Sequence, residues 1–514
     1  MSNESCSEKS QLKYTLLTGA TGLLGEYLLR DLLLKGIRVA VLVRPTKKMT
    51  VTRRIEEILL RWERDLRVAL PRPVILSGCL TSRNCGLTNA QIDWLRSSCE
   101  RVLHNAAVLT FVGVDRAREP WVTNVGGTQN VLNLCRETGV SDLHYVSTAY
   151  VCGERKGLIG ENQLDVGQGF RNDYERSKFE AECHVRECSW LDDPTIYRPA
   201  VISGDSETGY TSTYHGLYLY LRLIAMLVPR VPADENGIRH TPIRLPMSGG
   251  EPRNVVPVDW VAKVITRLLT TTEARGNTFH ISPDVPLTPR QVVEYCYSYF
   301  NSEGVIYCAD QPADRDEVSE FEREFLQNIQ MYQAYDRSDP IFDRTNLLRF
   351  AGDIPCPEID EQLLHRYLDF GERDRWGKRR KNAAPHLDPA EVRTTLPRPE
   401  ADPEAYASSG WSTLTIESSG PPLPPFEIGL DLHGPWGGQW HMVGNGGNRM
   451  KVRPGLPLKA DVPILHIPLV ELMNHFDDLE RPLHQYFKNV AAFDDGRWCL
   501  PLVSSLRQSL TATQ

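Results

Sequence analysis

The feature that most constrains this fold is a glycine-rich segment near the N-terminus, placed between an apolar run and an amphipathic stretch. Residues 14–17 form a short apolar run, and leucines such as Leu28 and Leu32 recur at helical spacing further on. Residues 18–25 between them read Thr-Gly-Ala-Thr-Gly-Leu-Leu-Gly. A strand, a glycine-rich turn and a helix in this order predict a doubly wound α/β fold that binds a dinucleotide at the turn.

Each glycine of this segment has a distinct physical task. Gly19 permits a sharp turn, Gly22 lets the backbone approach a pyrophosphate, and Gly25 allows the helix to pack closely on the strand. The first turn of the helix then offers free N–H groups to the anion. The predicted cofactor-binding residues of the turn are Gly19, Thr21, Gly22, Leu23, Leu24 and Gly25.

Short apolar runs continue to alternate with amphipathic stretches as far as about Gln291, which is typical of βαβ units and a parallel sheet. Six runs are predicted as central strands: 14–17, 38–43, 74–76, 102–104, 143–146 and 195–197. The predicted fold class is therefore α/β, a doubly wound parallel (Rossmann) sheet, with a smaller α+β domain at the C-terminus.

The residue after the second predicted strand bears on the choice of cofactor. Sites selective for NAD usually carry a carboxylate there to bind the ribose hydroxyls, but this chain has Arg44. A guanidinium can hold a 2′-phosphate through two hydrogen bonds, so the sequence favours NADPH over NADH. An ordinary surface arginine is the alternative interpretation.

Tyr174 and Lys178 form a Tyr-x-x-x-Lys pattern, and they would share one face of a helix. We expect the ammonium to lower the pKa of the phenol and to hold the nicotinamide ribose, so that Tyr174 can give up a proton as hydride arrives. Thr148 follows the fifth predicted strand, where parallel sheets bind ligands, and is expected to hydrogen-bond the reacting carbonyl oxygen.

Composition narrows the classes of partner. The chain has 58 Lys and Arg against 66 Asp and Glu, a net charge of −8, which gives no reason to expect nucleic acid. The first ten residues lack the apolar core of a signal peptide, and no stretch has the roughly 20 apolar residues of a membrane span, so we expect a cytoplasmic protein. The 12 cysteines lack metal-ligand spacing and are expected to be reduced thiols, with no metal site.

The domain organisation follows from composition and periodicity. We expect a nucleotide-binding domain over residues 11–375, whose substrate-binding part begins at about 200, a Pro-rich linker over 376–425, and a small α+β domain over 426–514. Residues 426–432 alternate as a half-buried strand, and 469–476 repeat at helical spacing. An aromatic stretch at 210–220 either roofs a substrate pocket or packs in the core.

Taken together, these motifs resemble the extended short-chain dehydrogenase/reductase family over about residues 12–300. The resemblance is carried by residues 18–25, 104–107 (His-Asn-Ala-Ala), 124–128 (Asn-Val-Gly-Gly-Thr), 147–151 (Ser-Thr-Ala-Tyr-Val) and 174–178, in the family's order and approximate spacing. It implies a catalytic triad of Thr148, Tyr174 and Lys178 with Asn124 in support. It also implies that further residues contact the cofactor: Asn105, Ala106, Ala107, Arg198 and Pro199.

Within that family the chain looks most like the thioester reductase and fatty acyl-CoA reductase branch. The matching segments are 42–44 (Leu-Val-Arg), a charged helix around 53–62, 86–88 (Gly-Leu-Thr) and 254–259 (Asn-Val-Val-Pro-Val-Asp). The chain departs from the branch where Gly-Asp-Leu is usual, since it has Cys79 followed by Leu80. A carboxylate expected near the adenine is thus replaced by a thiol.

The C-terminal domain resembles, over about 426–490, sterol-carrier-like lipid-binding domains. The resemblance is carried by the glycine-rich segment 434–440, Gly-Pro-Trp-Gly-Gly-Gln-Trp. It implies an apolar tunnel for a long acyl or isoprenoid chain. A small packing or dimerisation domain, and with it a homodimer, is the alternative.

The resemblance implies NADPH-dependent reduction of an acyl thioester, or of the aldehyde derived from it. The substrate would be a small acyl or lipid-like molecule, presented as a CoA or carrier-protein thioester. One alternative is an NAD(P)-dependent dehydrogenase or epimerase acting on a hydroxyl or ketone of a sterol or sugar. A second alternative is a non-catalytic nucleotide- or lipid-binding module.

Overall fold

The computed structural model describes residues 13–46, 49–245, 247–308, 320–329 and 338–378, together with five C-terminal strands. The chain forms two compact units. One comprises residues 1–14, 33–77 and 386–514, and the other comprises 15–32 and 78–385.

The nucleotide-binding part is built on a seven-stranded sheet of order β11-β7-β5-β4-β1-β2-β3. Its strands are β1 (Tyr14–Thr18), β2 (Val39–Val43), β3 (Val74–Ser77), β4 (Cys99–His104), β5 (Asp142–Val146), β7 (Thr195–Pro199) and β11 (Thr278–Ile281). The pairs β2–β3, β4–β5, β5–β7 and β7–β11 are parallel. The predicted Rossmann sheet and all six predicted strands are confirmed, and β11 was missed because His280 interrupts its apolar residues.

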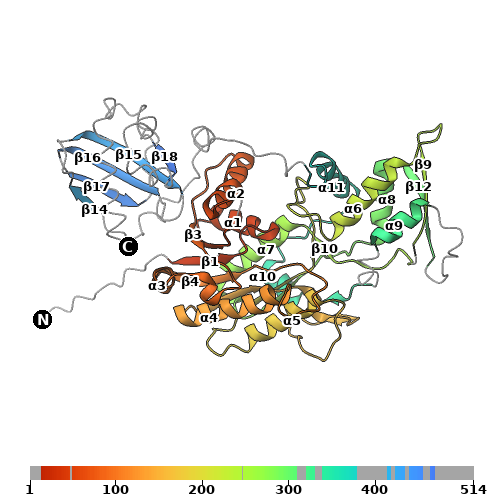
Figure 1. Ribbon diagram of the computed structural model, residues 1–514, viewed down its shortest axis with the longest axis horizontal. Coiled ribbons are helices and arrows are strands. Elements are labelled where there is room, and N and C mark those ends of the chain that lie inside the picture. Colours follow the sequence, from red (N-terminus) through yellow and green to blue (C-terminus); the bar gives the residue numbers. More distant parts are fainter. Residues whose placement is uncertain are drawn as a thin grey trace. The chain divides into compact units, whose positions relative to one another are not determined.

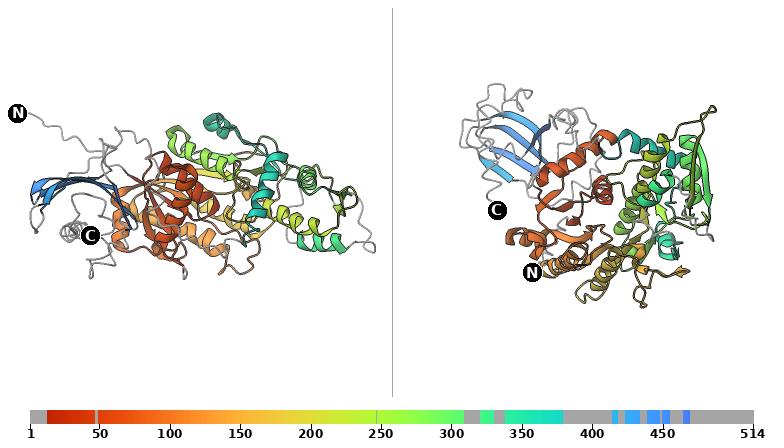
Figure 2. Two further views of the ribbon diagram at one scale, coloured as in Figure 1. Left: turned by 90° about the horizontal axis from the view of Figure 1, so that it is seen from above. Right: turned by 45° about the vertical axis from the view of Figure 1, so that its right-hand side comes forward.

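The strand order turns back on itself between β1 and β4, and open α/β sheets bind their ligands beside such a switch point. The surrounding helices are α1 (Leu23–Leu34), α2 (Val51–Leu66), α3 (Asn89–Ser98), α4 (Thr128–Thr138), α5 (Asp173–Arg186), α7 (Val258–Thr270) and α10 (Thr345–Ala351). Figures 1 and 2 show α1 and α7 on one side of the sheet and α4 and α5 on the other. Helices on both faces make the sheet doubly wound.

The substrate-binding part contains α6 (Leu217–Leu227), α8 (Pro289–Phe300), α9 (Glu320–Ile329) and α11 (Glu361–Arg373). Strands β9 (Arg239–Leu245) and β12 (Ser302–Tyr307) pair in parallel beside them. Two short parallel pairs complete this part: β6 (Leu158–Ile159) with β13 (Ile341–Phe342), and β8 (Val201–Ile202) with β10 (Val255–Val256).

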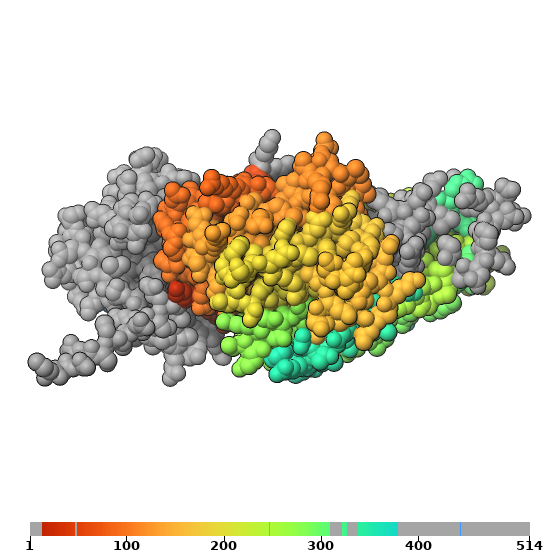
Figure 3. Space-filling view, turned by 90° about the horizontal axis from the view of Figure 1, so that it is seen from below, coloured from red at the N-terminus to blue at the C-terminus, as the bar shows by residue number. Residues whose placement is uncertain are grey.

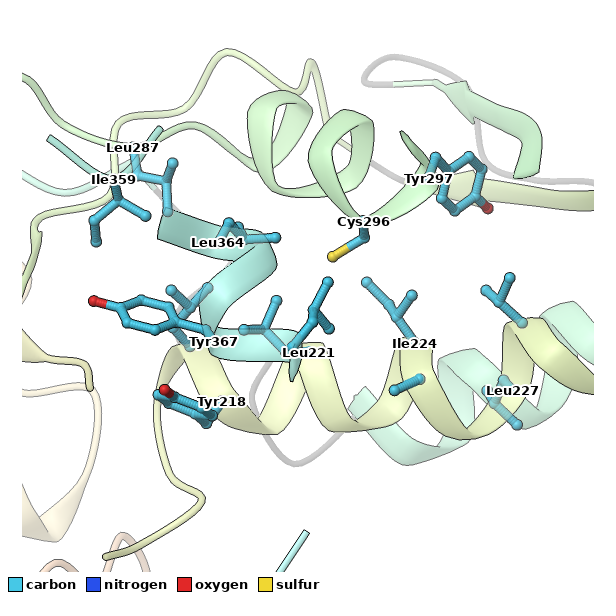
Figure 4. Close-up of a cluster of buried hydrophobic side chains, with 14 of the residues drawn as sticks. Tyr218, Leu221, Ile224, Leu227, Leu287, Cys296, Tyr297, Ile359, Leu364 and Tyr367 are labelled. Atoms are coloured by element: carbon cyan, nitrogen blue, oxygen red, sulfur yellow. The ribbon is translucent and has the colours of Figure 1, made fainter. Parts of the chain in front are cut away.

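The core of this part lies between α6, α8 and α11 (Figure 4). Tyr218 and Tyr367 face each other there with ring centroids 5.1 Å apart, and Tyr214 packs against Trp376. The aromatic stretch at 210–220 therefore contributes to this core.

The C-terminal strands form a separate five-stranded sheet of order β14-β17-β16-β15-β18. They are β14 (Leu414–Glu417), β15 (Leu423–His433), β16 (Gln439–Gly447), β17 (Arg449–Pro454) and β18 (Ile464–Pro468). Within this sheet the described pairs β14–β17, β15–β16 and β16–β17 are antiparallel, and the pair β15–β18 is parallel. The strand expected at 426–432 lies within β15, whereas the segment 434–438 and the helix expected at 469–476 lie outside the described residues.

The predicted linker boundary at 425 is wrong, because β14 and the start of β15 precede it. Residues 414–417 alternate apolar and polar residues, which is typical of a strand. The run is short and stands between serines and prolines, so the composition of the surrounding segment predicted a linker instead. Among the residues described, no helix combines the length and apolarity that crossing a bilayer requires. The same residues contain no group of three or more His, Cys, Asp or Glu arranged to hold a metal ion.

Candidate active site

The glycine-rich turn connects β1 to α1 with the close backbone contacts that glycine allows. Gly19 has φ +73°, and a Cβ there would lie 2.8 Å from the backbone of Ala106. A Cβ on Gly25 would lie 1.9 Å from the Gly19 carbonyl oxygen, whereas a Cβ on Gly22 would meet only that oxygen, at 3.5 Å. Gly22 therefore has room on its outer side, at the N-terminus of α1, for an approaching anion.

Thr18 joins the glycine-rich turn to the His-Asn-Ala-Ala segment after β4. Its hydroxyl lies 2.7 Å from His104 Nδ1 and accepts hydrogen bonds of 3.1 Å from the N–H groups of Asn105 and Ala106. The predicted cofactor residues 105–107 are thus held beside Gly19 by a buried hydroxyl. The two segments meet where the adjacent strands β1 and β4 end.

A hydrogen-bonded chain continues from His104 to the helix that carries the predicted catalytic pair. His104 Nε2 lies 3.1 Å from the Thr128 hydroxyl, which donates to the Asn124 carbonyl oxygen at 2.6 Å. The Asn124 amide donates to the Ser177 hydroxyl at 2.9 Å, and Ser177 donates to the Tyr174 carbonyl oxygen at 2.8 Å.

Asn124 lies in a π-helical turn, Val122–Gly127, a deviation from α-helix that is frequent at functional sites. Its side chain also bonds both backbone groups of Val108. Asn124 thus links Val108 to Ser177 of α5, and its supporting role for the catalytic group stays a prediction.

Tyr174 is placed beside Thr148, but its acidity differs from expectation. Burial raises the pKa of Tyr174 to about 12, the nearby Glu175 carboxylate adds to this, and a hydrogen bond with Thr148 acts in the opposite direction. The expected lowering of the phenol pKa by Lys178 is wrong for this structure, because desolvation dominates. The phenol remains protonated at neutral pH and is therefore suited to donate a proton rather than to accept one.

Lys178 is almost fully buried, and its ammonium bonds to strand β5. Its Nζ donates to the Tyr145 hydroxyl at 2.7 Å and to the Val146 carbonyl oxygen at 2.8 Å. Burial lowers the pKa of Lys178 to about 7, against an opposing attraction from Glu182. The side chain is thus poised between charged and neutral forms near physiological pH.

This pKa gives a testable pH dependence for nucleotide binding. The ammonium exists mainly below pH 7, and its charge attracts an anionic dinucleotide, so we expect the affinity for NADPH to fall about tenfold as pH rises through 7. Titration calorimetry from pH 5.5 to 9 checks this, with Lys178→Met as the reference that removes the titration. Identical pH profiles for the two proteins would contradict the expectation.

Thr148 follows β5 and caps the short 3₁₀ turn Ala149–Cys152, accepting from the Tyr150 N–H at 3.3 Å. Its hydroxyl also lies 3.5 Å from the Pro199 carbonyl oxygen at the end of β7. A side-chain hydrogen bond joins Thr148, after β5, to Tyr174 on α5, so two predicted site residues from different elements lie together.

Arg198 is placed differently from the expectation that it lies near the nicotinamide. Its side chain is fully buried, and its guanidinium binds the Glu182 carboxylate, with a shortest distance of 2.6 Å. Its other terminal nitrogen donates to the carbonyl oxygens of Glu161 and Gln163. Because these bonds occupy the guanidinium inside the fold, we assign Arg198 to the support of α5 rather than to the cofactor.

Cys79 and Leu80 lie in the loop after β3. The Cys79 N–H donates to the Cys85 carbonyl oxygen at 2.7 Å, and the Leu80 carbonyl oxygen accepts from the Asn130 side chain at 2.7 Å. Asn84 and Cys85 adopt left-handed conformations in the same loop. The loop is therefore fixed by its own backbone, and the role of Cys79 toward an adenine stays a prediction.

Arg44 lies directly after β2, and α2 brings a second arginine to it. Arg54 donates from its guanidinium to the Arg44 carbonyl oxygen at 2.7 Å. The pKa of Arg54 is lowered by burial and by the charge of Arg44. Two guanidinium groups that repel each other form a local positive field suited to a multiply charged anion.

A cavity of about 680 Å³ lies along α5. It is lined by Phe111, Val112, Gln168, Gly169, Phe170, Arg171, Asn172, Asp173, Arg176, Phe179 and Glu180. The orange to yellow segments of the chain are exposed on the face drawn in Figure 3. The lining includes none of Thr148, Tyr174 and Lys178, but the Phe111 ring contacts Tyr174 edge-on and Asp173 directly precedes it, so this cavity adjoins the predicted catalytic group.

Comparison with known proteins agrees with this geometry. Residues 17–265 match an NAD-binding family model described as male sterility protein. The resemblance to the thioester reductase branch of the extended short-chain dehydrogenase/reductases is therefore confirmed for this segment, and with it the class of nicotinamide-dependent oxidoreductases. The preference for NADPH over NADH stays a prediction.

Individual relatives point the same way. The chain is 28% identical over 71% of its length to a linear gramicidin synthase of Brevibacillus parabrevis, and 27% identical over 69% to aldehyde reductase lnaA of Aspergillus flavus. It spans only 7% and 35% of those two proteins. Among solved structures, the terminal R domain of the myxalamid PKS-NRPS pathway matches 72% of this chain and 93% of its own, with TM-score 0.57 and 25% identity.

Sequence reasoning missed several residues that the structure places at the site: Tyr145, Ser147, Ser177, Glu182 and Arg54. Tyr145 was hidden in an apolar strand. Glu182 stands four residues after Lys178 on the same helix, and this spacing was a usable signal.

Proposed function

We propose that this chain is an NADPH-dependent reductase of acyl thioesters, or of the aldehydes derived from them. The observation that carries the proposal is the meeting of Thr148 and the protonated phenol of Tyr174 at the ends of β5 and β7, with Lys178 one helical turn away. The relative named aldehyde reductase and the R domain of the myxalamid pathway support the same chemistry.

The residues at the turn fit a nicotinamide dinucleotide. Gly22 leaves open space at the start of α1 and Gly19 contacts Ala106, so a pyrophosphate can approach the helix N-terminus. Such a cofactor, when bound, supplies the hydride. In our proposal its binding residues are Gly19, Thr21, Gly22, Leu23, Leu24, Gly25, Asn105, Ala106 and Ala107, with Cys79, Leu80 and Pro199 at the periphery.

The side chains of this chain handle the oxygen and the proton. Thr148 and Tyr174 hydrogen-bond the carbonyl oxygen of the substrate and stabilise the negative charge that develops on it. Tyr174 then transfers its proton to that oxygen, because its high pKa keeps it protonated until an alkoxide forms. Lys178 holds the ribose. In its charged form it also stabilises the negative charge that remains on Tyr174 after the proton is transferred.

The two arginines near the end of β2 account for the proposed preference for NADPH. We expect Arg44→Ala and Arg54→Ala each to weaken NADPH binding by about 10- to 100-fold, since a hydrogen bond to a charged group contributes about 1.5–3 kcal/mol. NADH binding should be almost unchanged. Arg53→Ala is the matched control, because Arg53 is exposed and pairs with Glu57 at 3.0 Å.

Dissociation constants for both dinucleotides, measured by fluorescence titration, check this prediction. Loss of NADPH and NADH binding in equal measure would contradict a role in 2′-phosphate recognition. An Arg53→Ala effect as large as that of Arg44→Ala would contradict it as well.

The acyl group is proposed to arrive as a pantetheine thioester, on CoA or on a carrier protein. The names of the relatives, a linear gramicidin synthase and a PKS-NRPS R domain, support this presentation. The test follows NADPH absorbance with acyl-CoAs, acyl-loaded carrier protein, fatty aldehydes and hydroxysteroids. Thioester-dependent oxidation of NADPH supports the proposal. Turnover of hydroxysteroids alone would indicate that the chain is a dehydrogenase instead.

A further inference from the structure

A buried carboxylate lies one helical turn beyond Lys178 and is used by none of the steps above. Glu182 is fully buried on α5. It accepts a 2.6 Å hydrogen bond from the Ser147 hydroxyl at the end of β5. Ser147 is the immediate neighbour of Thr148, so this bond joins the two elements that carry the predicted catalytic group.

Arginines on two elements hold the same carboxylate. Arg198 on β7 binds it with three contacts of 2.6 to 3.2 Å, and Arg186 on α5 binds it at 2.8 and 3.0 Å. Burial would raise the pKa of Glu182, but the charges of Arg198 and Arg186 and the hydrogen bonds from Arg198 and Ser147 together outweigh it and lower the pKa to about 2. The carboxylate is therefore charged at all working pH values and cannot serve as a proton donor.

The backbone around Ser147 completes the arrangement. The Ser147 N–H donates to the Tyr197 carbonyl oxygen at 2.7 Å, in the residue before Arg198. Ser147 is thus tied to β7 by its backbone and to α5 by its side chain. A shift of α5 relative to β5 would break the Ser147–Glu182 bond and move Tyr174 away from Thr148.

We propose that Glu182 is a positioning residue for the reduction, which ties Ser147 and Arg198 to the helical turn after Lys178 and thereby holds Thr148, Tyr174 and Lys178 in one array. This inference rests on the proposed function for its catalytic readout. Glu182 acts through other residues and touches no reacting atom.

The carboxylate also affects the charge of Lys178. The groups near the Lys178 ammonium are the Tyr145 hydroxyl, the Val146 carbonyl oxygen, Glu182 and the neutral His104. Glu182 is the group among them that favours the charged form. Removal of its charge leaves Arg198 and Arg186 near the site and lowers the pKa of Lys178 further.

The test uses the full chain and four variants. We expect Glu182→Gln to lower kcat at least about tenfold through misplacement of the reacting groups, and to move the loss of NADPH affinity to lower pH. Ser147→Ala keeps the carboxylate–arginine pair and should lower kcat about threefold to tenfold, whereas Ser147→Thr keeps the hydroxyl and should restore it. Glu180→Gln is the matched control, since Glu180 lies on α5 but pairs with Arg116 and Arg176 on the outer face.

The outcomes separate this inference from the proposed function. A folded Glu182→Gln protein with wild-type kcat and an unchanged pH profile would overturn it. If Glu182→Gln does not fold, equal kcat values for Ser147→Ala and the wild type would overturn it instead. The pH profile of NADPH binding needs no substrate, so a shifted profile in a chain that reduces no thioester contradicts the proposed function but supports the effect of Glu182 on the charge of Lys178.

Discussion

Replacement of Tyr174 by phenylalanine is expected to lower kcat for thioester reduction by about 10²- to 10⁴-fold, the range of a positioned general acid. The phenol is the proton donor in the proposed reaction, and the ring of Phe111 contacts it edge-on, so a phenylalanine keeps the packing. The NADPH dissociation constant should therefore change little. Steady-state kinetics and a binding titration on the same protein check both parts.

Tyr197→Phe provides the control for this substitution. Tyr197 is also a fully buried tyrosine, but its hydroxyl bonds to His144 on β5 at 2.8 Å. Its kcat should stay within a few-fold of the wild type. A Tyr174→Phe protein with nearly full activity would exclude Tyr174 as the proton donor.

The glycine-rich turn gives the second large expected effect. Gly25→Ala places a Cβ at 1.9 Å from the Gly19 carbonyl oxygen, so α1 must move away from the turn. We expect a loss of at least about 3 kcal/mol in the free energy of unfolding, the upper end for overpacked sites, together with loss of NADPH binding. Urea unfolding and a binding titration measure the two effects.

Gly22→Ala separates packing from binding at the same turn. Its Cβ meets the Gly19 carbonyl oxygen at an ordinary 3.5 Å, so stability should change by less than about 1 kcal/mol. The added methyl group occupies the space through which a pyrophosphate approaches, and NADPH affinity should fall at least about tenfold. Unchanged NADPH affinity in Gly22→Ala would contradict the placement of the pyrophosphate at this turn.

The sheet could be predicted from sequence because local patterns determine it. Six strands stood out as apolar runs between amphipathic stretches, and Gly19 and Gly25 occur where backbone contacts leave no room for a side chain, whereas Gly22 leaves open space at the start of α1. Strand β11 contains His280, whose side chain is buried through hydrogen bonds with Arg198 and with the Asp343 carbonyl oxygen. Because the sequence does not show these tertiary contacts, the polar histidine interrupts the apolar pattern and the strand was not recognised.

The residues of the site could be predicted, but not their electrostatics. Spacing on one helix placed Tyr174 beside Lys178, yet the direction of the phenol pKa depends on burial, which spacing does not give. Arg198 was expected at the cofactor, and its partner Glu182 comes from another element of the fold. Such long-range pairs become visible only when the strands and helices are assembled.

In the proposed reaction hydride from NADPH adds to the carbonyl carbon of an acyl thioester, and the hemithioacetal that forms breaks its C–S bond to release the thiol and the aldehyde. The most direct measurement is a single-turnover reaction with NADPH deuterated at the transferable C4 position and an acyl-pantetheine thioester, analysed by mass spectrometry. We predict one deuterium on C1 of the released aldehyde, and its loss in Tyr174→Phe. Tight NADPH binding with no deuterium in any product would contradict hydride transfer by this chain.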